Sequence, residues 1–185
     1  MTKIAAGPAA RVLIRAARPG DIERLRDILN TEILTSTASW TTAARTSQAM
    51  TDWMDGRVEA GFPVLVAVDQ GTKVVGGYAS YGPFRAGEGY AGTVEHSVYV
   101  HGDFRRSGMA TSLIGALLSQ ATEAGKRLMI GGVSSDQLAS LHLHRKLGFR
   151  EVGRIPGAGH KFGKALDLVL MARSLLPGNA APQLH

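Results

Sequence analysis

Apolar and polar residues alternate through the stretch 93–100, TVEHSVYV. Alternation that includes β-branched residues is the pattern of a half-buried strand. Side chains of such a strand point to opposite faces in turn, here Val94, His96, Val98 and Val100 to one face and Glu95, Ser97 and Tyr99 to the other. The pattern therefore predicts a central strand that presents the Glu95 carboxylate on the face opposite to His96.

The remaining periodicity predicts a chain in which strand hairpins come first and helical crossovers follow. Period-two patterns place strands over 12–16, 62–69, 73–81, 127–133, 149–155 and 166–172. Helical patterns follow Pro19, run over 46–60 and 108–124, and extend from a cap within 134–136 to Leu147. A glycine-bearing loop is expected over 156–163. We predict an α/β fold with a single mixed, curved sheet flanked by helices.

The segment after the central strand carries the most distinctive chemistry. Its residues are Arg105, Arg106, Ser107, Gly108, Met109 and Ala110, and they open directly into an apolar helix. Backbone N–H groups at a helix start, with cations nearby, form a binding site for anions. The sequence thus predicts a phosphate-binding loop next to the strand that carries Glu95, which is the arrangement of a base beside a phosphorylated cofactor.

Composition narrows the class of protein. The chain has 185 residues, a formal net charge of +6, 44% hydrophobic residues and no cysteine. These values fit one domain over 12–174, between a flexible leader at 1–11 and a tail at 175–185. Without cysteine, disulfides, thiolate metal sites and a cysteine nucleophile are excluded, and we expect a cytoplasmic protein. No apolar run is long enough to span a membrane, and neither a Lys/Arg-rich arm nor interleaved aromatic residues point to nucleic acid.

Several blocks of the sequence resemble the GNAT N-acetyltransferases, in particular their phosphinothricin acetyltransferase branch. The blocks are Arg105-x-x-Gly108-x-Ala110 after TVEHSVYV, ASLHLH at 139–144 with LGF at 147–149, KFG at 161–163 with LDL at 166–168, ASW at 38–40, FPVLV at 62–66 and GYAS at 77–80. The resemblance is closest to methionine sulfoximine and methionine sulfone acetyltransferases. It implies a GNAT fold with a cofactor wedge between the central strand and the strand at 127–133.

The resemblance implies acetyl-CoA as the cofactor and assigns residues to it. Backbone groups of Val98, Tyr99 and Val100 would pair with the pantetheine arm. The pyrophosphate would be held by the loop residues Arg105, Arg106, Ser107, Gly108, Met109, Ala110 and Thr111. Gln137 stands where the family usually has an asparagine that contacts CoA, and Ser140 is either a CoA contact or a packing residue.

For the reaction, the resemblance and the chemistry of the residues agree on Glu95. A protonated α-amine must lose its proton before it attacks a thioester, and Glu95 is placed to take that proton, directly or through a water. His144 stands where many GNAT enzymes carry a tyrosine that protonates the leaving thiolate, so an acid role and a structural hydrogen bond are both open. His142 and His144 point in different directions on a helix, so we predict no metal site.

The expected acceptor is a small amino-acid-like amine such as methionine sulfone, methionine sulfoximine or phosphinothricin. Arg85 would bind its anionic group. The other residues assigned to the acceptor side are Trp40, Tyr90, Lys161 and Phe162, with Tyr81 and Phe84 as further candidates for the pocket wall. Ala165 replaces a tryptophan of the family there, and with Gln137 it keeps open the alternative of a CoA-binding module without turnover. A second alternative is an acetyltransferase of protein or peptide amines. The resemblance also implies a homodimer.

Overall fold

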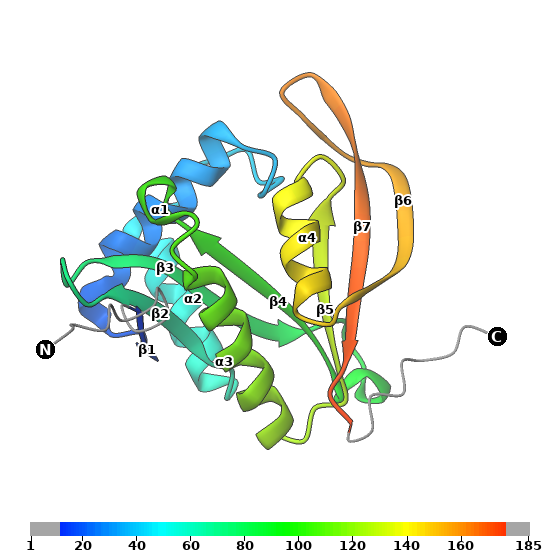
Figure 1. The fold of residues 1–185 in the computed structure, drawn as a ribbon, viewed down its shortest axis with the longest axis horizontal. Coiled ribbons are helices and arrows are strands. Elements are labelled where there is room, and N and C mark those ends of the chain that lie inside the picture. The colour runs from blue at the N-terminus through cyan, green and yellow to red at the C-terminus, as the bar shows by residue number, and fades with distance from the viewer. Residues whose placement is uncertain (1–11, 177–185) are drawn as a thin grey trace, which may run out of the picture.

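The computed structural model describes residues 12–176. A single seven-stranded sheet forms the centre of this part of the chain. Its strands are β1 (Val12–Ala16), β2 (Val64–Asp69), β3 (Val75–Pro83), β4 (Thr93–Val100), β5 (Leu128–Ser134), β6 (Arg150–Lys161) and β7 (Lys164–Ser174). Their order is β1-β2-β3-β4-β5-β7-β6, with β4 and β5 parallel and the other pairs antiparallel. The predicted mixed α/β fold with one curved sheet is confirmed (Figure 1).

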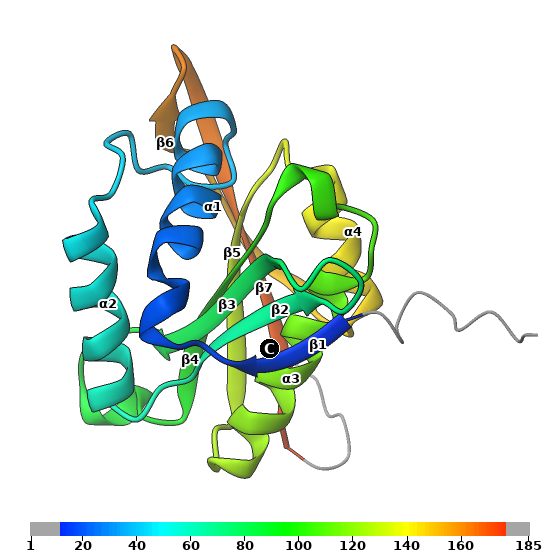
Figure 2. The same ribbon diagram turned by 90° about the vertical axis from the view of Figure 1, so that its left-hand side faces the viewer.

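Helices cover both faces of the sheet. They are α1 (Ile22–Thr35), α2 (Ser47–Glu59), α3 (Met109–Glu123) and α4 (Leu138–Lys146). The apolar stripes of α1 and α2 pack on one face, for example through Leu25 and Met54 against Tyr78. Those of α3 and α4 pack on the other, for example through Leu117 and Leu141. Figure 2 shows these two layers on either side of the strands.

The two central strands pair along only part of their length. The β4–β5 register runs from Thr93 opposite Leu128 to His96 opposite Gly131. Beyond that point β4 continues to Val100 bonded to β3, and β5 continues to Ser134 bonded to β7. The sheet thus separates into two halves, and Figure 1 shows them diverging. This divergence is the wedge that the resemblance implies.

The loop predicted over 156–163 is wrong. β6 continues to Lys161, and a turn of Phe162 and Gly163, both with positive φ, leads directly into β7. Glycines and a proline hide the period-two pattern here, and the register shifts between Ile155 and Gly159. The result is a long hairpin that projects from the body of the sheet (Figures 1 and 2).

Some boundaries also differ from expectation. α4 begins after Gln137 rather than after a cap within 134–136, because Ser134 still belongs to β5. Leu175, assigned to the tail, is buried in the core, and its N–H donates to the Arg127 carbonyl. The leader at 1–11 and the segment 177–185 lie outside the described residues. Within residues 12–176, no helix has both the length and the apolar character needed to cross a bilayer.

Candidate active site

The diverging ends of β4 and β5 enclose a cavity of about 80 Å³. It is lined by residues of both strands and by Ala38, Gln137, Ser140 and His144. Of the residues that the sequence assigns to the cofactor, the cavity therefore brings together Val98, Tyr99, Gln137 and Ser140, whereas Val100 does not line it. Strand edges without a partner offer backbone N–H and C=O groups, to which an extended arm with amide groups can add as a strand does.

Glu95 lies beside this cavity, near the last paired residues of β4. It is opposite Gly82 of β3 and Ile130 of β5. Its Oε1 faces Gly132, where an added Cβ would lie only 3.1 Å away. Burial raises the pKa of the half-buried Glu95 carboxyl, and the positive charge of Arg85 opposes that rise. A carboxylate with a raised pKa next to a cavity has the properties of a general base.

Arg85 and Tyr90 lie in the connection between β3 and β4. The Arg85 guanidinium is 5.1 Å from the centre of the Phe84 ring, and the Phe84 and Tyr90 rings meet edge to face at 6.1 Å. The Phe84 and Tyr90 rings thus pack beside the exposed Arg85 side chain, whose positive charge lies within electrostatic reach of Glu95. A cation within electrostatic reach of a carboxylate matches the carboxylate and the ammonium group of an amino acid.

The loop between β4 and α3 has the backbone of an anion site. Arg106 and Gly108 have φ values of 60° and 85°, and the Ser107 hydroxyl braces the loop by donating to the Phe104 carbonyl at 2.6 Å. Within residues 12–176, the N–H groups of 106–111 donate to no acceptor, and the first helical bond is that from Ser112 to Gly108. These N–H groups fit a diphosphate. The Met109 side chain is buried, so Met109 can offer only its backbone, as can Ala110.

The two arginines of this loop have different surroundings. Arg105 Nη2 lies 2.6 Å from Oε1 of Glu32, a carboxylate in the last turn of α1 that is 4% exposed. The other carboxylate oxygen of Glu32 accepts a hydrogen bond from the Ser36 hydroxyl, also at 2.6 Å. The Arg105 guanidinium is thus paired with α1 although its side chain is 60% exposed, and Arg106 is exposed as well.

The segment Ser36–Trp40, which we call the strap, leads away from α1 and joins the two halves of the sheet. Gln137 Nε2 donates to the Thr37 hydroxyl at 2.7 Å, and that hydroxyl donates to the Asp136 carboxylate at 2.8 Å. Gln137, assigned to the cofactor, lines the wedge cavity but directs its amide to the strap.

Lys161 and Trp40 attach the strap to the β6–β7 hairpin. Lys161 is 3% exposed and donates to the carbonyls of Ser36 and Ser39, at 2.7 Å and 2.5 Å. The Trp40 ring packs on Gly159, where an added Cβ would lie 2.3 Å from the ring, so only glycine permits this approach. Lys161 therefore holds the strap in place, and any effect of Lys161 on the wedge is transmitted by the strap.

His144 and His96 form a buried pair within the wedge. Nδ1 of His144 lies 2.7 Å from the Ser140 carbonyl and therefore carries the donated proton. The two Nε2 atoms are 3.2 Å apart, so His96 donates and His144 accepts. Burial lowers the pKa of both imidazoles, that of His96 to about 3. His144 is thus neutral with both ring nitrogens engaged. It makes the structural hydrogen bond, and its acid role stays a prediction.

Two aromatic residues assigned to the acceptor side lie elsewhere. Tyr81 is buried against Phe62. It lies opposite His96 in the β3–β4 register, so its side chain is on the face of the sheet opposite to Glu95. The expectation that Tyr81 walls the acceptor pocket is therefore wrong. Phe162 is 56% exposed in the hairpin turn, with the Lys161 ammonium 4.9 Å from its ring centre. The structure does not bring Phe162 to the wedge.

Sequence reasoning missed Glu32, although a signal was present. Leu25 and Ile28 mark the buried stripe of α1, and Glu32 continues that stripe one turn later. A carboxylate on an apolar stripe must find a partner, because an unpaired buried charge is costly. The pattern indicates a buried ion pair but cannot name Arg105 as the partner.

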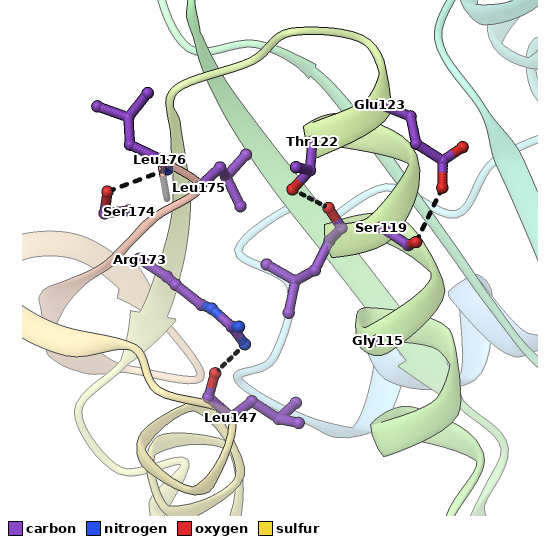
Figure 3. A pocket seen from close by; sticks show the side chains of 10 residues that line it. Gly115, Ser119, Thr122, Glu123, Leu147, Arg173, Ser174, Leu175 and Leu176 are labelled. Atoms are coloured by element: carbon purple, nitrogen blue, oxygen red, sulfur yellow. Dashed lines mark hydrogen bonds between the residues drawn. The ribbon is translucent and has the colours of Figure 1, made fainter. Parts of the chain in front are cut away.

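A larger hollow, of about 680 Å³, lies between the C-terminal half of α3 and the end of β7 (Figure 3). Its polar groups are already engaged. Arg173 donates to the Leu147 carbonyl, Thr122 donates to the Leu118 carbonyl, and Ser119 donates to Glu123. No residue assigned to catalysis lines this hollow, so the chemistry favours the wedge.

A wedge between parallel strands with an anion site at its mouth defines an enzyme that uses a phosphorylated acyl carrier, and comparison with known proteins identifies the family. The profile of the acetyltransferase (GNAT) family matches residues 23–149. Over 169 residues the chain is 41% identical to the L-methionine sulfoximine/L-methionine sulfone acetyltransferase of Pseudomonas paraeruginosa, covering 91% of this chain and 98% of that protein. It is also 41% identical to the L-amino acid N-acyltransferase MnaT of Escherichia coli, over 88% and 93% of the two chains.

Solved structures agree with this assignment. The structure of yncA from Salmonella typhimurium, a putative acetyltransferase with acetyl-CoA, matches with a TM-score of 0.86 at 36% identity, over 95% of this chain and 99% of that chain. Phosphinothricin N-acetyltransferases are relatives at 29% to 33% identity. The chain belongs to the GNAT acetyltransferase family. It is an acetyl-CoA-dependent N-acetyltransferase.

Proposed function

We propose that this enzyme acetylates the α-amine of a small amino acid of the methionine sulfone, methionine sulfoximine or phosphinothricin type, with Glu95 as the general base. The observation that carries the proposal is the position of the Glu95 carboxylate against Gly132 of the wedge lining, where burial raises its pKa and Arg85 lies within electrostatic reach. The names of the relatives support the same substrate class.

Acetyl-CoA supplies an acetyl group that is activated as a thioester. The unpaired edge of β4 at Val98–Val100 would bind the pantetheine amides, and the N–H groups of 106–111 would bind the pyrophosphate. Arg85 would hold the anionic group of the acceptor. Glu95 would take the ammonium proton, directly or through a water, so that the nitrogen lone pair is free to attack. The N–H of Val98 or Tyr99 is the candidate donor to the carbonyl oxygen.

The test is amine-dependent release of free thiol from acetyl-CoA, followed with a thiol reagent across a panel of the three amino acids and an acetylatable peptide. The proposal expects release with at least one of the amino acids. Binding of acetyl-CoA without thiol release for any amine would indicate a CoA-binding module. Release with the peptide alone would indicate a protein acetyltransferase.

We also propose that the enzyme is a homodimer, as the resemblance implies. Sedimentation at micromolar concentration should give twice the chain mass. A monomer mass across that range would contradict the dimer while leaving the chemistry of the wedge unaffected.

A further inference from the structure

We infer that Glu32 is a positioning residue that couples the cofactor loop to the acceptor side of the wedge, so that CoA and the amine each strengthen the binding of the other. The inference rests on the proposed function, because it takes the wedge as the cofactor site and the strap as a wall of the acceptor site.

The first observation is the burial of Glu32 between two segments. Its carboxylate is 4% exposed, with one oxygen 2.6 Å from Arg105 Nη2 and the other 2.6 Å from the Ser36 hydroxyl. Arg105 begins the phosphate-binding loop, and Ser36 begins the strap. One carboxylate therefore binds both segments, although Ser36 and Arg105 are 69 positions apart in the chain.

The second observation is that the strap continues into the wedge. Ala38 lines the wedge cavity together with Val98 and Tyr99 of β4, the strand edge assigned to the cofactor. Trp40 then closes on Gly159 of the hairpin. A shift of Ser36 would thus move residues on both the cofactor side and the acceptor side.

The charges around Glu32 support the same role. Arg105 pairs with Glu32 directly. Burial lowers the pKa of the Lys161 ammonium, and the negative charge of Glu32 partly opposes that lowering. Lys161 in turn donates to the carbonyls of Ser36 and Ser39. Both oxygens of the buried Glu32 carboxylate are thus engaged, one by the 60% exposed Arg105 side chain and the other by Ser36, so Arg105 and the strap share one anchor.

Coupling follows from this arrangement. When CoA fixes the loop that begins at Arg105, it also fixes Glu32 and, through Ser36, the strap that the amine contacts. The amine then binds to a wall that is already ordered, and the effect is reciprocal because it is a difference in binding free energy.

The experiment measures binding of CoA and of L-methionine sulfone, or of phosphinothricin if that amine is turned over faster, each alone and each with the other at saturation. Calorimetry gives the ratio of the amine Kd without CoA to that with CoA. We expect a ratio of about 5 to 150 for the wild type. Glu32→Gln should bring it to within about twofold of unity, because the amide is neutral and cannot pair with Arg105 as an ion.

Two further variants decide between positioning and general destabilisation. Glu23→Gln removes an exposed carboxylate of α1 that pairs with Arg26 at 2.6 Å, and the coupling ratio should stay that of the wild type. Ser36→Ala removes the hydroxyl that donates to Glu32 and accepts from the Ala38 N–H within the strap, and it decides the matter if Glu32→Gln fails to fold. Its ratio should fall although the pair with Arg105 remains.

The outcomes separate this inference from the proposed function. A wild type that turns over amines but shows no coupling, or a Glu32→Gln variant that keeps the full ratio, overturns the inference alone. A wild type that binds no CoA overturns the proposed function, and the inference with it. Loss of coupling in Glu32→Gln and Ser36→Ala, with coupling kept in Glu23→Gln, supports both.

Discussion

Nε2 of His96 lies 3.2 Å from Nε2 of His144, in a buried stack whose ring centres are 5.1 Å apart. Only one of these two nitrogens can carry a proton, because two N–H groups facing each other at that distance would repel. Burial opposes a positive charge on His96, and so does the electrostatic effect of His144; together they lower the pKa of His96 to about 3. The pair is therefore held neutral within the wedge.

This neutrality predicts that the protein loses stability in acid. His96 has an ordinary pKa of 6.5 when unfolded and one of about 3 when folded, so the unfolded state binds a proton that the folded state does not. The stability is present above pH 6.5 and is lost as the pH falls towards 3. In urea titrations, His96→Asn should reduce the slope of unfolding free energy against pH by up to about 1.4 kcal/mol per unit. His142→Asn, at an exposed position of the same helix as His144, should keep the wild-type slope; equal slopes in the wild type and His96→Asn would contradict the buried pair.

Arg85 should set the pH at which the enzyme becomes active. Its positive charge lowers the pKa of Glu95, against the rise caused by burial. In Arg85→Gln that opposing effect is lost, so the pKa of Glu95 rises and the acidic limb of kcat/KM moves to higher pH. KM for the amine should also rise, since the cation that binds its anionic group is gone. A limb that stays in place, or moves to lower pH, would show that Arg85 does not act on Glu95.

Because Trp40 packs on Gly159, we expect the effect of a glycine-to-alanine substitution to differ sharply between two positions of β6. Gly159→Ala would place a methyl group 2.3 Å from the ring, whereas Gly153→Ala has its nearest neighbour, Leu170, at 3.9 Å. We expect Gly159→Ala to displace Trp40, to destabilise by about 1–3 kcal/mol and to raise KM for the amine more than that for acetyl-CoA. Thermal unfolding and steady-state kinetics of the two variants provide the comparison, and similar behaviour of both would rule out the contact as a determinant of the acceptor site.

Lys161 should matter through the strap carbonyls that it holds. Lys161→Met keeps most of the side-chain volume but leaves the carbonyls of Ser36 and Ser39 without their donor. The expected cost is about 1–3 kcal/mol of unfolding free energy, with a rise in KM for the amine. Lys164→Met, at the exposed first residue after the turn, is the matched control. Wild-type kinetics in Lys161→Met would remove the strap from the acceptor site.

The sequence was informative where function depends on local pattern. The alternation in TVEHSVYV predicts the central strand and the face of Glu95, and the loop with Gly108 predicts the anion site, because both follow from a few consecutive residues. The glycines of 156–163 concealed the end of β6, since a bulged strand pairs without regular alternation.

The sequence failed where function depends on contacts between distant segments. Lys161 lies in a family block and Gln137 replaces a family asparagine, yet the polar atoms of both bind the strap, 125 and 100 positions away. Glu32 interrupts an apolar stripe, which indicates a buried partner, but only the packing of α1 against the loop identifies it as Arg105. Such partners follow from the tertiary arrangement and leave no local trace.

The most direct test of the account is the rate of thiol release by Glu95→Gln, measured with methionine sulfone or phosphinothricin beside the affinity of the same variant for acetyl-CoA. The variant keeps the shape of the side chain and removes the base. The account predicts a fall in kcat of about 10²–10⁴-fold, with an acetyl-CoA Kd within about twofold of the wild type. A kcat that is unchanged while acetyl-CoA still binds would contradict it.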